Sequence, residues 1–157
     1  MNYSNEIVCN IIDFIETNLN CKISIEDITN KFFYDRYYLM KLFKREMGIS
    51  IIVFINYFRI YHSINDIRNT TYSLTKIALF NGFSSIEYFS EVFHQVIGVS
   101  PRDYRLFVKR HFSITQDKVD IILDHWIQLQ SFVQFVHKYK KNKKPVMAPV
   151  HKLSIFY

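Results

Sequence analysis

The sequence has few of the residues that interrupt regular structure, because only 3 of its 157 residues are glycine and 3 are proline. A β-sandwich or barrel needs many tight turns, which these two residue types usually supply. Their scarcity therefore favours long helices with short joints, and we predict an all-α fold. Hydrophobic residues make up 49% of the chain, so a packed core is available and global disorder is not expected.

Cysteine is equally scarce, with Cys9 and Cys21 alone. Two cysteines provide neither a disulfide framework nor the ligand spacing of a zinc site. We interpret them as small, partly buried thiols in a reducing cytoplasm. The N-terminus lacks the basic and then apolar segments of a signal peptide. No apolar run reaches the length of a membrane span, so a membrane is not an expected partner.

Patterns of catalytic residues are missing too. The 6 histidines are scattered, and the sequence contains no HExxH pair, no Gly-rich phosphate loop and no grouping of His, Cys and Asp. We therefore expect neither an enzyme nor a protein that holds a metal or a cofactor.

The sequence does carry positive charge, since its formal net charge is +6. A basic chain suits a polyanionic partner, either nucleic acid or an anionic membrane surface. The abundance of Asn, Ile, Lys, Tyr and Phe is also what an AT-rich coding sequence would produce. Charge alone therefore does not separate a nucleic-acid-binding protein from a merely basic one.

Apolar spacing and capping residues predict a series of helices. We expect them, in chain order, over residues 5–19, 25–32, 36–47, 50–67, 74–80, 84–98, 101–110 and 116–139. Most begin at a serine or aspartate that suits an N-cap, and Gly48 and Gly98 are natural C-terminal stops. Residues 24–27 and 84–87 each match a capping box, in which a serine and an acid three residues later exchange backbone hydrogen bonds.

An internal repeat divides this series of helices into two similar units. Residues 43–50 recur fifty positions later as residues 93–100, with phenylalanine, glycine, a β-branched residue and serine at the same offsets. Residues 28–39 correspond to residues 77–89 with one residue less, so the first turn is expected to be tighter, and it has no glycine. Two helices across a short turn are the helix-turn-helix unit, whose second helix enters the DNA major groove.

Residues 77–105 closely resemble the C-terminal signature of the AraC/XylS family of bacterial transcription regulators. The matching residues are Ile77, Ala78, Gly82, Phe83, Tyr88, Phe89, Phe93, Gly98, Ser100, Pro101, Tyr104 and Arg105. The first unit also fits, and the resemblance covers roughly residues 5–110. It implies two helix-turn-helix subdomains joined by a long linking helix over residues 50–67, with recognition helices in adjacent major-groove segments.

The same resemblance implies a domain organisation and a set of partners. We expect a DNA-binding domain over residues 1–112 and a C-terminal helical extension with a basic tail over residues 113–157. Double-stranded DNA is the expected partner, and RNA polymerase is a second candidate. The expected location is the bacterial cytoplasm, at the nucleoid.

Candidate DNA contacts in the first unit lie opposite the apolar side of the helix over residues 36–47. They are Arg36, Tyr37, Met40, Lys41, Lys44 and Arg45. By resemblance, Tyr37, Met40 and Lys41 fall on base-facing positions. Lysine donates to guanine O6 and N7, and apolar groups contact the thymine methyl, whereas Lys44 and Arg45 suit phosphates. The alternatives are a solvated basic face and, for Met40, packing inside the protein.

The second recognition helix presents a different set, with almost no positive charge. Its candidates are Ser85, Ile86, Glu87, Tyr88, Ser90, Glu91 and His94. Glu91 can accept from cytosine N4 but repels phosphates. The family often has a basic or polar residue at the position of Glu91 and usually a lysine or arginine at that of His94. We therefore expect the first unit to supply most of the affinity, while the second adds shape fit, backbone N–H contacts or selectivity. A purely structural second unit is the alternative.

Three arginines outside these helices have other expected roles. By resemblance, Arg59 and Arg105 brace helices, with base reading as the alternative. Arg102 lies in the first turn of its helix, where we expect it to be exposed and able to contact a phosphate.

The tail carries an apolar stripe too broad for one solvated helix. Its members are Val119, Ile122, Leu123, Trp126, Ile127, Leu129, Phe132, Val133 and Val136. It must pack on the DNA-binding domain, on a second copy or on another protein, with Trp126 and Phe132 as anchors. The alternative function is therefore an interaction module, or a DNA-poor antagonist, that dimerises with a fuller regulator through residues 115–139. The lysines of residues 138–144 form either a solvated tail or a phosphate-binding arm, and residues 145–157 a loose extension.

Overall fold

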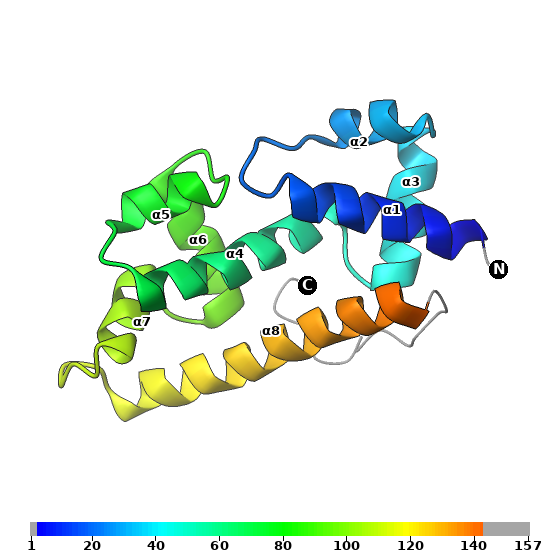
Figure 1. The fold of residues 1–157 in the computed structure, drawn as a ribbon. Coiled ribbons are helices and arrows are strands. Elements are labelled where there is room, and N and C mark those ends of the chain that lie inside the picture. The colour runs from blue at the N-terminus through cyan, green and yellow to red at the C-terminus, as the bar shows by residue number, and fades with distance from the viewer. Residues whose placement is uncertain (1–2, 143–157) are drawn as a thin grey trace.

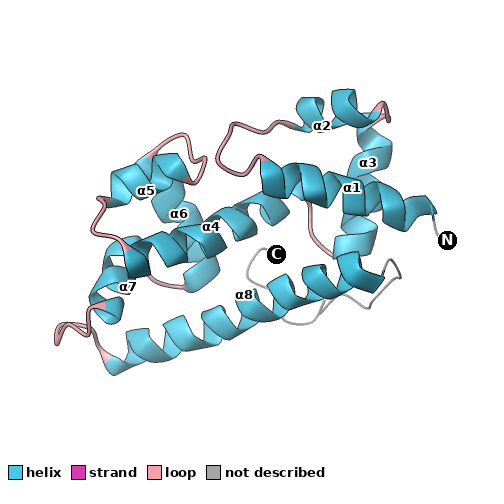
Figure 2. Ribbon diagram, viewed as in Figure 1, coloured by secondary structure: helices cyan, strands magenta, loops and turns pink. Residues whose placement is uncertain are grey.

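The computed structural model describes residues 3–142, and these form eight α-helices and no strand (Figure 1, Figure 2). This confirms the all-α prediction. The helices are α1 (Tyr3–Thr17), α2 (Ile25–Phe32), α3 (Arg36–Met47), α4 (Ile51–Asn69), α5 (Leu74–Phe80), α6 (Ile86–Ile97), α7 (Pro101–Val108) and α8 (Gln116–Asn142).

Helix α4 joins two helix-turn-helix units, as the repeat predicts. The pair α2 and α3 lies at one end of α4, and the pair α5 and α6 lies at the other (Figure 1). Helix α1 packs on α3, and α7 packs on α4 and α6. Each recognition helix is therefore held by its own small group of helices, and α4 is shared by both groups.

Side-chain caps start most of these helices where the sequence predicts. The capping box before α2 is present, because the amide of Asp27 donates to Ser24 Oγ at 3.1 Å and the amide of Ser24 donates to Asp27 Oδ2 at 2.8 Å. The second predicted box, over residues 84–87, is wrong. The N-cap is Ser85, which accepts from the amide of Tyr88 at 3.1 Å, so the third helical residue is a tyrosine and Glu87 cannot close a box.

The turns of the two units reach the same left-handed conformation with different residues. Gly82 has φ of 82°, and an added Cβ there would lie 2.2 Å from Leu19 O and 2.9 Å from Arg59 Nε. In the shorter first turn the left-handed residue is Phe33, with φ of 57° and a side chain that is 91% exposed. A bulky residue in this region is strained, and nothing in its packing compensates.

Arg59 and Arg105 both hold neighbouring segments together, as the resemblance implies. Arg105 of α7 donates from a terminal nitrogen to Tyr72 O, in the loop before α5, at 2.7 Å. Arg59 is buried in α4 and donates from Nε to Leu19 O at 2.9 Å and from a terminal nitrogen to Cys21 O at 2.7 Å. Its guanidinium carbon also lies 5.8 Å from the centre of the Phe83 ring. Burial lowers the pKa of Arg59, but an arginine stays charged in proteins, so both carbonyls receive a charged donor.

The apolar stripe of α8 packs on the rest of the chain, which was one of the three predicted possibilities. Phe132 is fully buried, with its ring 5.9 Å from that of Phe54 and 5.3 Å from that of Tyr57. Trp126 is half-buried and stacks on Tyr61 at 5.8 Å. Both predicted anchors therefore hold α8 against α4.

Two details of the tail differ from the prediction. The sequence predicts Leu123 and Ile127 in the stripe, but they are 47% and 62% exposed because they lie on the outer side of α8. The described start of the lysine run is only partly a solvated tail. Lys138 and Lys141 are exposed, but Tyr139 is buried and Lys140 pairs with two acids of α1. The rest of that run, from residue 143, and the extension over residues 145–157 lie outside the described residues.

Replacing Phe33 by glycine should stabilise the protein. The left-handed conformation costs a residue with a Cβ about 1–2 kcal/mol, whereas glycine loses about 0.5–1 kcal/mol more chain entropy on folding. The net gain in the free energy of unfolding is about 0.5–1 kcal/mol, measurable by urea denaturation. Phe112→Gly is the control, since Phe112 is 94% exposed and has no positive φ. A less stable Phe33→Gly protein would contradict the strain.

Replacing Arg59 by alanine should destabilise the protein by about 3 kcal/mol, because two carbonyls lose a charged donor in a buried place. Urea denaturation with circular dichroism measures the change. The matched control is Arg102→Ala, because Arg102 is exposed and its loss should stay within about 0.5 kcal/mol. Equal effects of the two substitutions would contradict the bracing role.

Candidate nucleic-acid interface

Helix α3 presents a basic face on the side opposite its buried residues. The helix begins at its N-cap Asp35, which accepts from the amide of Tyr38 at 3.1 Å, and ends at Gly48, whose φ is 78°. Burial of Leu39, Leu42 and Phe43 fixes the rotation of the helix. The six predicted contacts of this helix are consequently all exposed: Arg36, Tyr37, Met40, Lys41, Lys44 and Arg45.

The cations on this face differ in how far they are engaged within the protein. Arg36 pairs with Glu26, but both side chains are more than half exposed, so water screens the pair and it contributes little. Arg45 donates to Glu46 Oε1 from Nε at 3.1 Å. Lys41 is exposed and has no hydrogen-bond or ion-pair partner within residues 3–142. It is therefore the lysine on this face that is most accessible to a ligand.

Apolar groups lie among these cations. A groove of about 360 Å³ runs between α3 and the start of α4, and Ile25, Tyr37, Met40, Ile51 and Ile52 contribute its apolar lining. Tyr37 is 75% exposed and Met40 is 39% exposed. Met40 thus lies at the edge of the groove and remains open to solvent. The face combines lysine donors with apolar groups, which is the chemistry that reads guanine and thymine in the major groove.

Helix α6 holds several of its predicted contacts in structural roles. Ser85 is the N-cap, and Ile86 packs against the core. The hydroxyl of Tyr88 accepts from Asn56 Nδ2 at 2.9 Å, so α4 tethers it. Ser90 is half-buried, and the exposed predicted contacts are Glu87, Glu91, His94 and Tyr88 itself, which is 37% exposed.

The two recognition helices therefore differ in charge. The sequence of α3 contains four lysines and arginines and one acid, Glu46, whose side chain is 10% exposed. The sequence of α6 contains two acids and no lysine or arginine. A polyanion is attracted by the outer face of α3 and is not attracted by that of α6.

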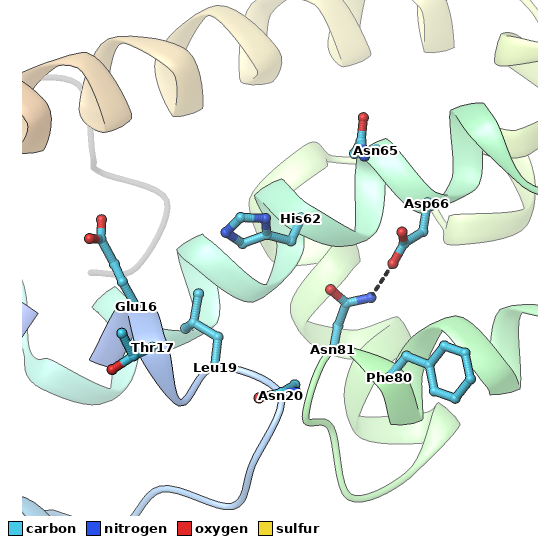
Figure 3. Close-up of a pocket in the computed structure, with 9 residues that line it drawn as sticks. All are labelled: Glu16, Thr17, Leu19, Asn20, His62, Asn65, Asp66, Phe80 and Asn81. Carbon is cyan, nitrogen blue, oxygen red and sulfur yellow. Dashed lines mark hydrogen bonds between the residues drawn. The ribbon is translucent and has the colours of Figure 1, made fainter. Parts of the chain in front are cut away.

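A hollow of about 400 Å³ between α1, α4 and α5 has acidic side chains in its lining, unlike the basic face of α3 (Figure 3). Its lining includes Glu16, His62 and Asp66, and Asn81 Nδ2 donates to Asp66 Oδ2 at 2.7 Å. It contains no lysine or arginine, so it does not suit phosphates. Within residues 3–142, no group of three or more His, Cys, Asp or Glu residues could hold a metal ion.

Among the helices of the described chain, none is by itself long and apolar enough to cross a membrane, and only α3 and α4 together, bent by 55°, reach that length and composition.

Comparisons with known proteins cover the segment that contains both recognition helices. The family model of a helix-turn-helix domain matches residues 28–106. The uncharacterised regulator YbfP of Bacillus subtilis is 31% identical over 111 residues, and the lactose operon transcription activator of Staphylococcus xylosus is 32% identical over 110 residues. These matches cover 71% and 70% of this chain, but the chain spans only 38% of the length of either relative.

Shorter relatives and solved structures match in the same way. The activator AarP of Providencia stuartii is 29% identical over 104 residues, which are 66% of this chain and 77% of that protein. The C-terminal domain of AraT, a response regulator from Geobacillus stearothermophilus, is 26% identical with a TM-score of 0.62. The match covers 70% of this chain and 88% of that one. The likeness thus extends over α2 to α7, and the family model ends before α8 begins.

Proposed function

Because the chain belongs to the AraC-type helix-turn-helix family of transcription regulators, we propose that it is a sequence-specific DNA-binding regulator that inserts α3 and α6 into adjacent major-groove segments. The observation that carries the proposal is the paired unit with one strongly basic recognition helix. At 1.5 Å per residue the 19 residues of α4 span roughly 28 Å. That length is comparable with the roughly 34 Å between successive major-groove segments on one DNA face.

In this proposal α3 supplies most of the affinity and much of the base reading. Lys41 donates to guanine, while Tyr37 and Met40 contact bases or thymine methyl groups. Arg36, Lys44 and Arg45 bind phosphates, which fix the register of the protein without reading sequence. Arg36 and Arg45 exchange their carboxylate partners for phosphate oxygens when they do so.

Helix α6 then acts chiefly on selectivity. Its exposed predicted contacts are Glu87, Tyr88, Glu91 and His94. A carboxylate near DNA is favourable only where it accepts from a cytosine N4. A second, overlapping set of predicted contacts holds the helix in position and so affects how its shape fits the DNA groove. Its members are Ser85, Ile86, Tyr88 and Ser90. A wrong base opposite Glu91 leaves an unpaired carboxylate close to phosphates, which rejects that sequence.

The alternative, in which residues 115–139 join the chain to a fuller regulator, is not favoured. The apolar stripe of α8 that would carry such contacts is mostly buried within this chain, with Phe132, Val133 and Val136 all inaccessible. We further propose that the protein acts in the bacterial cytoplasm, bound to nucleoid DNA, and that it has no catalytic activity.

The proposal predicts distinct effects for two lysines of α3 in fluorescence anisotropy with a library of promoter-derived duplexes. Lys41→Ala should bring the preferred and non-preferred duplexes closer in affinity, at a cost of about 1–3 kcal/mol on the preferred one. Lys44→Ala should weaken all duplexes alike and lower the slope of log affinity against log salt by about one. If the parent protein bound no duplex better than random DNA at physiological salt, the proposed function would be wrong.

Replacing Glu91 on α6 should strengthen non-specific DNA binding, whereas the lysine substitutions on α3 weaken DNA binding. Glu91→Gln removes a carboxylate that repels phosphates, so binding to random duplexes should tighten by about twofold to fivefold. At the same time, discrimination between preferred and random duplexes should fall. Glu6→Gln is the matched control, because Glu6 is an exposed acid on α1. Equal tightening by both variants would show that only net charge matters and that Glu91 has no special place.

A further inference from the structure

Helix α8 lies outside the segment that the family model matches, yet it contacts both helix-turn-helix units. It runs from the α7 end of the molecule to the end where α1 and α3 lie (Figure 1). Its 27 residues make it the longest helix of the described chain. A helix of this length attached at both ends can restrain the two units relative to each other.

The first end of α8 is attached to the second unit. Lys118 Nζ bonds to Asp103 Oδ2 of α7 at 2.9 Å, and this hydrogen bond is the main reason that the pKa of Asp103 is lowered. A turn further on, α8 lies directly against Gly98, the residue that ends α6. A Cβ at Gly98 would be 2.4 Å from Ile121 Cγ2 and 2.9 Å from His125 Cε1. The C-terminal end of the second recognition helix therefore rests on α8.

The other end of α8 is attached to the first unit by polar contacts. The hydroxyl of Tyr139 donates to Glu46 Oε2 of α3 at 3.2 Å, while Glu46 Oε1 accepts from Arg45 Nε. Lys140 Nζ lies 2.5 Å from Asp13 Oδ1 and 2.6 Å from Glu16 Oε2 of α1. Burial raises the pKa of Tyr139, so the hydroxyl keeps its proton. The C-terminal end of the first recognition helix is thus held as well.

The centre of α8 keeps these two attachments in register. Phe132 lies among the rings of Phe54, Tyr57 and Phe58 on α4, and the Arg68 guanidinium carbon lies 4.9 Å above Trp126. Close packing of rings leaves little freedom to slide, because small shifts create voids or clashes. Each end of α8 is consequently fixed relative to α4.

We propose that α8 is a brace that sets the distance and angle between the two recognition helices, and that Tyr139 and Lys140 are the positioning residues that close it on the first unit. Its effect on recognition rests on the proposed DNA-binding function. Two recognition helices at a fixed separation fit operators with one spacing between the two contacted segments. The brace thereby makes half-site spacing part of what the protein reads.

The test compares two neighbouring lysines. Lys140→Glu places a third acid beside Asp13 and Glu16, which should detach the end of α8. Lys141→Glu makes the same change of charge one residue further on, at an exposed lysine without a hydrogen-bond or ion-pair partner in the described part of the chain. Both variants change the formal net charge by the same amount, so the comparison between them reports on the brace.

The first readout needs no DNA. Spin labels are attached through Asn30→Cys on α2 and Thr75→Cys on α5, both exposed positions, in a Cys21→Ser background. Pulsed electron resonance should give one narrow distance distribution for the parent and for Lys141→Glu, and a clearly broader one for Lys140→Glu. If Lys140→Glu does not fold, as judged by circular dichroism, Lys140→Gln replaces it and should still broaden the distribution. Unchanged distributions would overturn the proposal.

The second readout uses DNA. The preferred duplex is altered by inserting or removing one base pair between the two contacted segments. The parent and Lys141→Glu should lose about tenfold in affinity or more, whereas Lys140→Glu should lose less than about threefold. Equal losses in all three proteins would also overturn the proposal. If the parent showed no specific binding at all, the proposed function would fail, and the distance measurement would still decide whether α8 is a brace.

Discussion

The contact between the loop that leads into the first helix-turn-helix unit and the turn of the second depends on one buried guanidinium, that of Arg59. It reaches from α4 to the carbonyls of Leu19 and Cys21 before the first unit and lies against Phe83 of the second. A buried charge is tolerated only when its donors are satisfied, so these three segments must meet around it. Gly82 follows from the same constraint, because any side chain there would strike Leu19 O and Arg59.

This arrangement fixes two recognition helices of unequal character. Helix α3 combines cations with exposed apolar groups, and α6 presents acids and gives several of its polar groups to capping and to Asn56. In the function that we propose, affinity for DNA comes mainly from the first unit, while the second contributes shape and rejection of wrong sequences. The residues that identify the family are concentrated in the second unit, whereas the charge that suits DNA is concentrated in the first.

Much of this could be predicted from sequence because local signals determine it. Asp35, Ser50, Ser73 and Ser100 cap helices as expected, and Gly48 and Gly98 end them. The start of α6 could not be placed, because Ser84 and Ser85 are equally good caps and only packing chooses between them. The role of Lys140 was hidden within a lysine run, since its acidic partners lie more than a hundred residues earlier in the chain.

A methylation-protection and hydroxyl-radical footprint of a selected duplex tests the central claim, paired major-groove binding by α3 and α6, most directly. We predict protection of guanine N7 in two major-groove segments about one helical turn apart on one face of the DNA, with stronger protection in one segment than in the other. Protection in a single segment, or in the minor groove only, would contradict it.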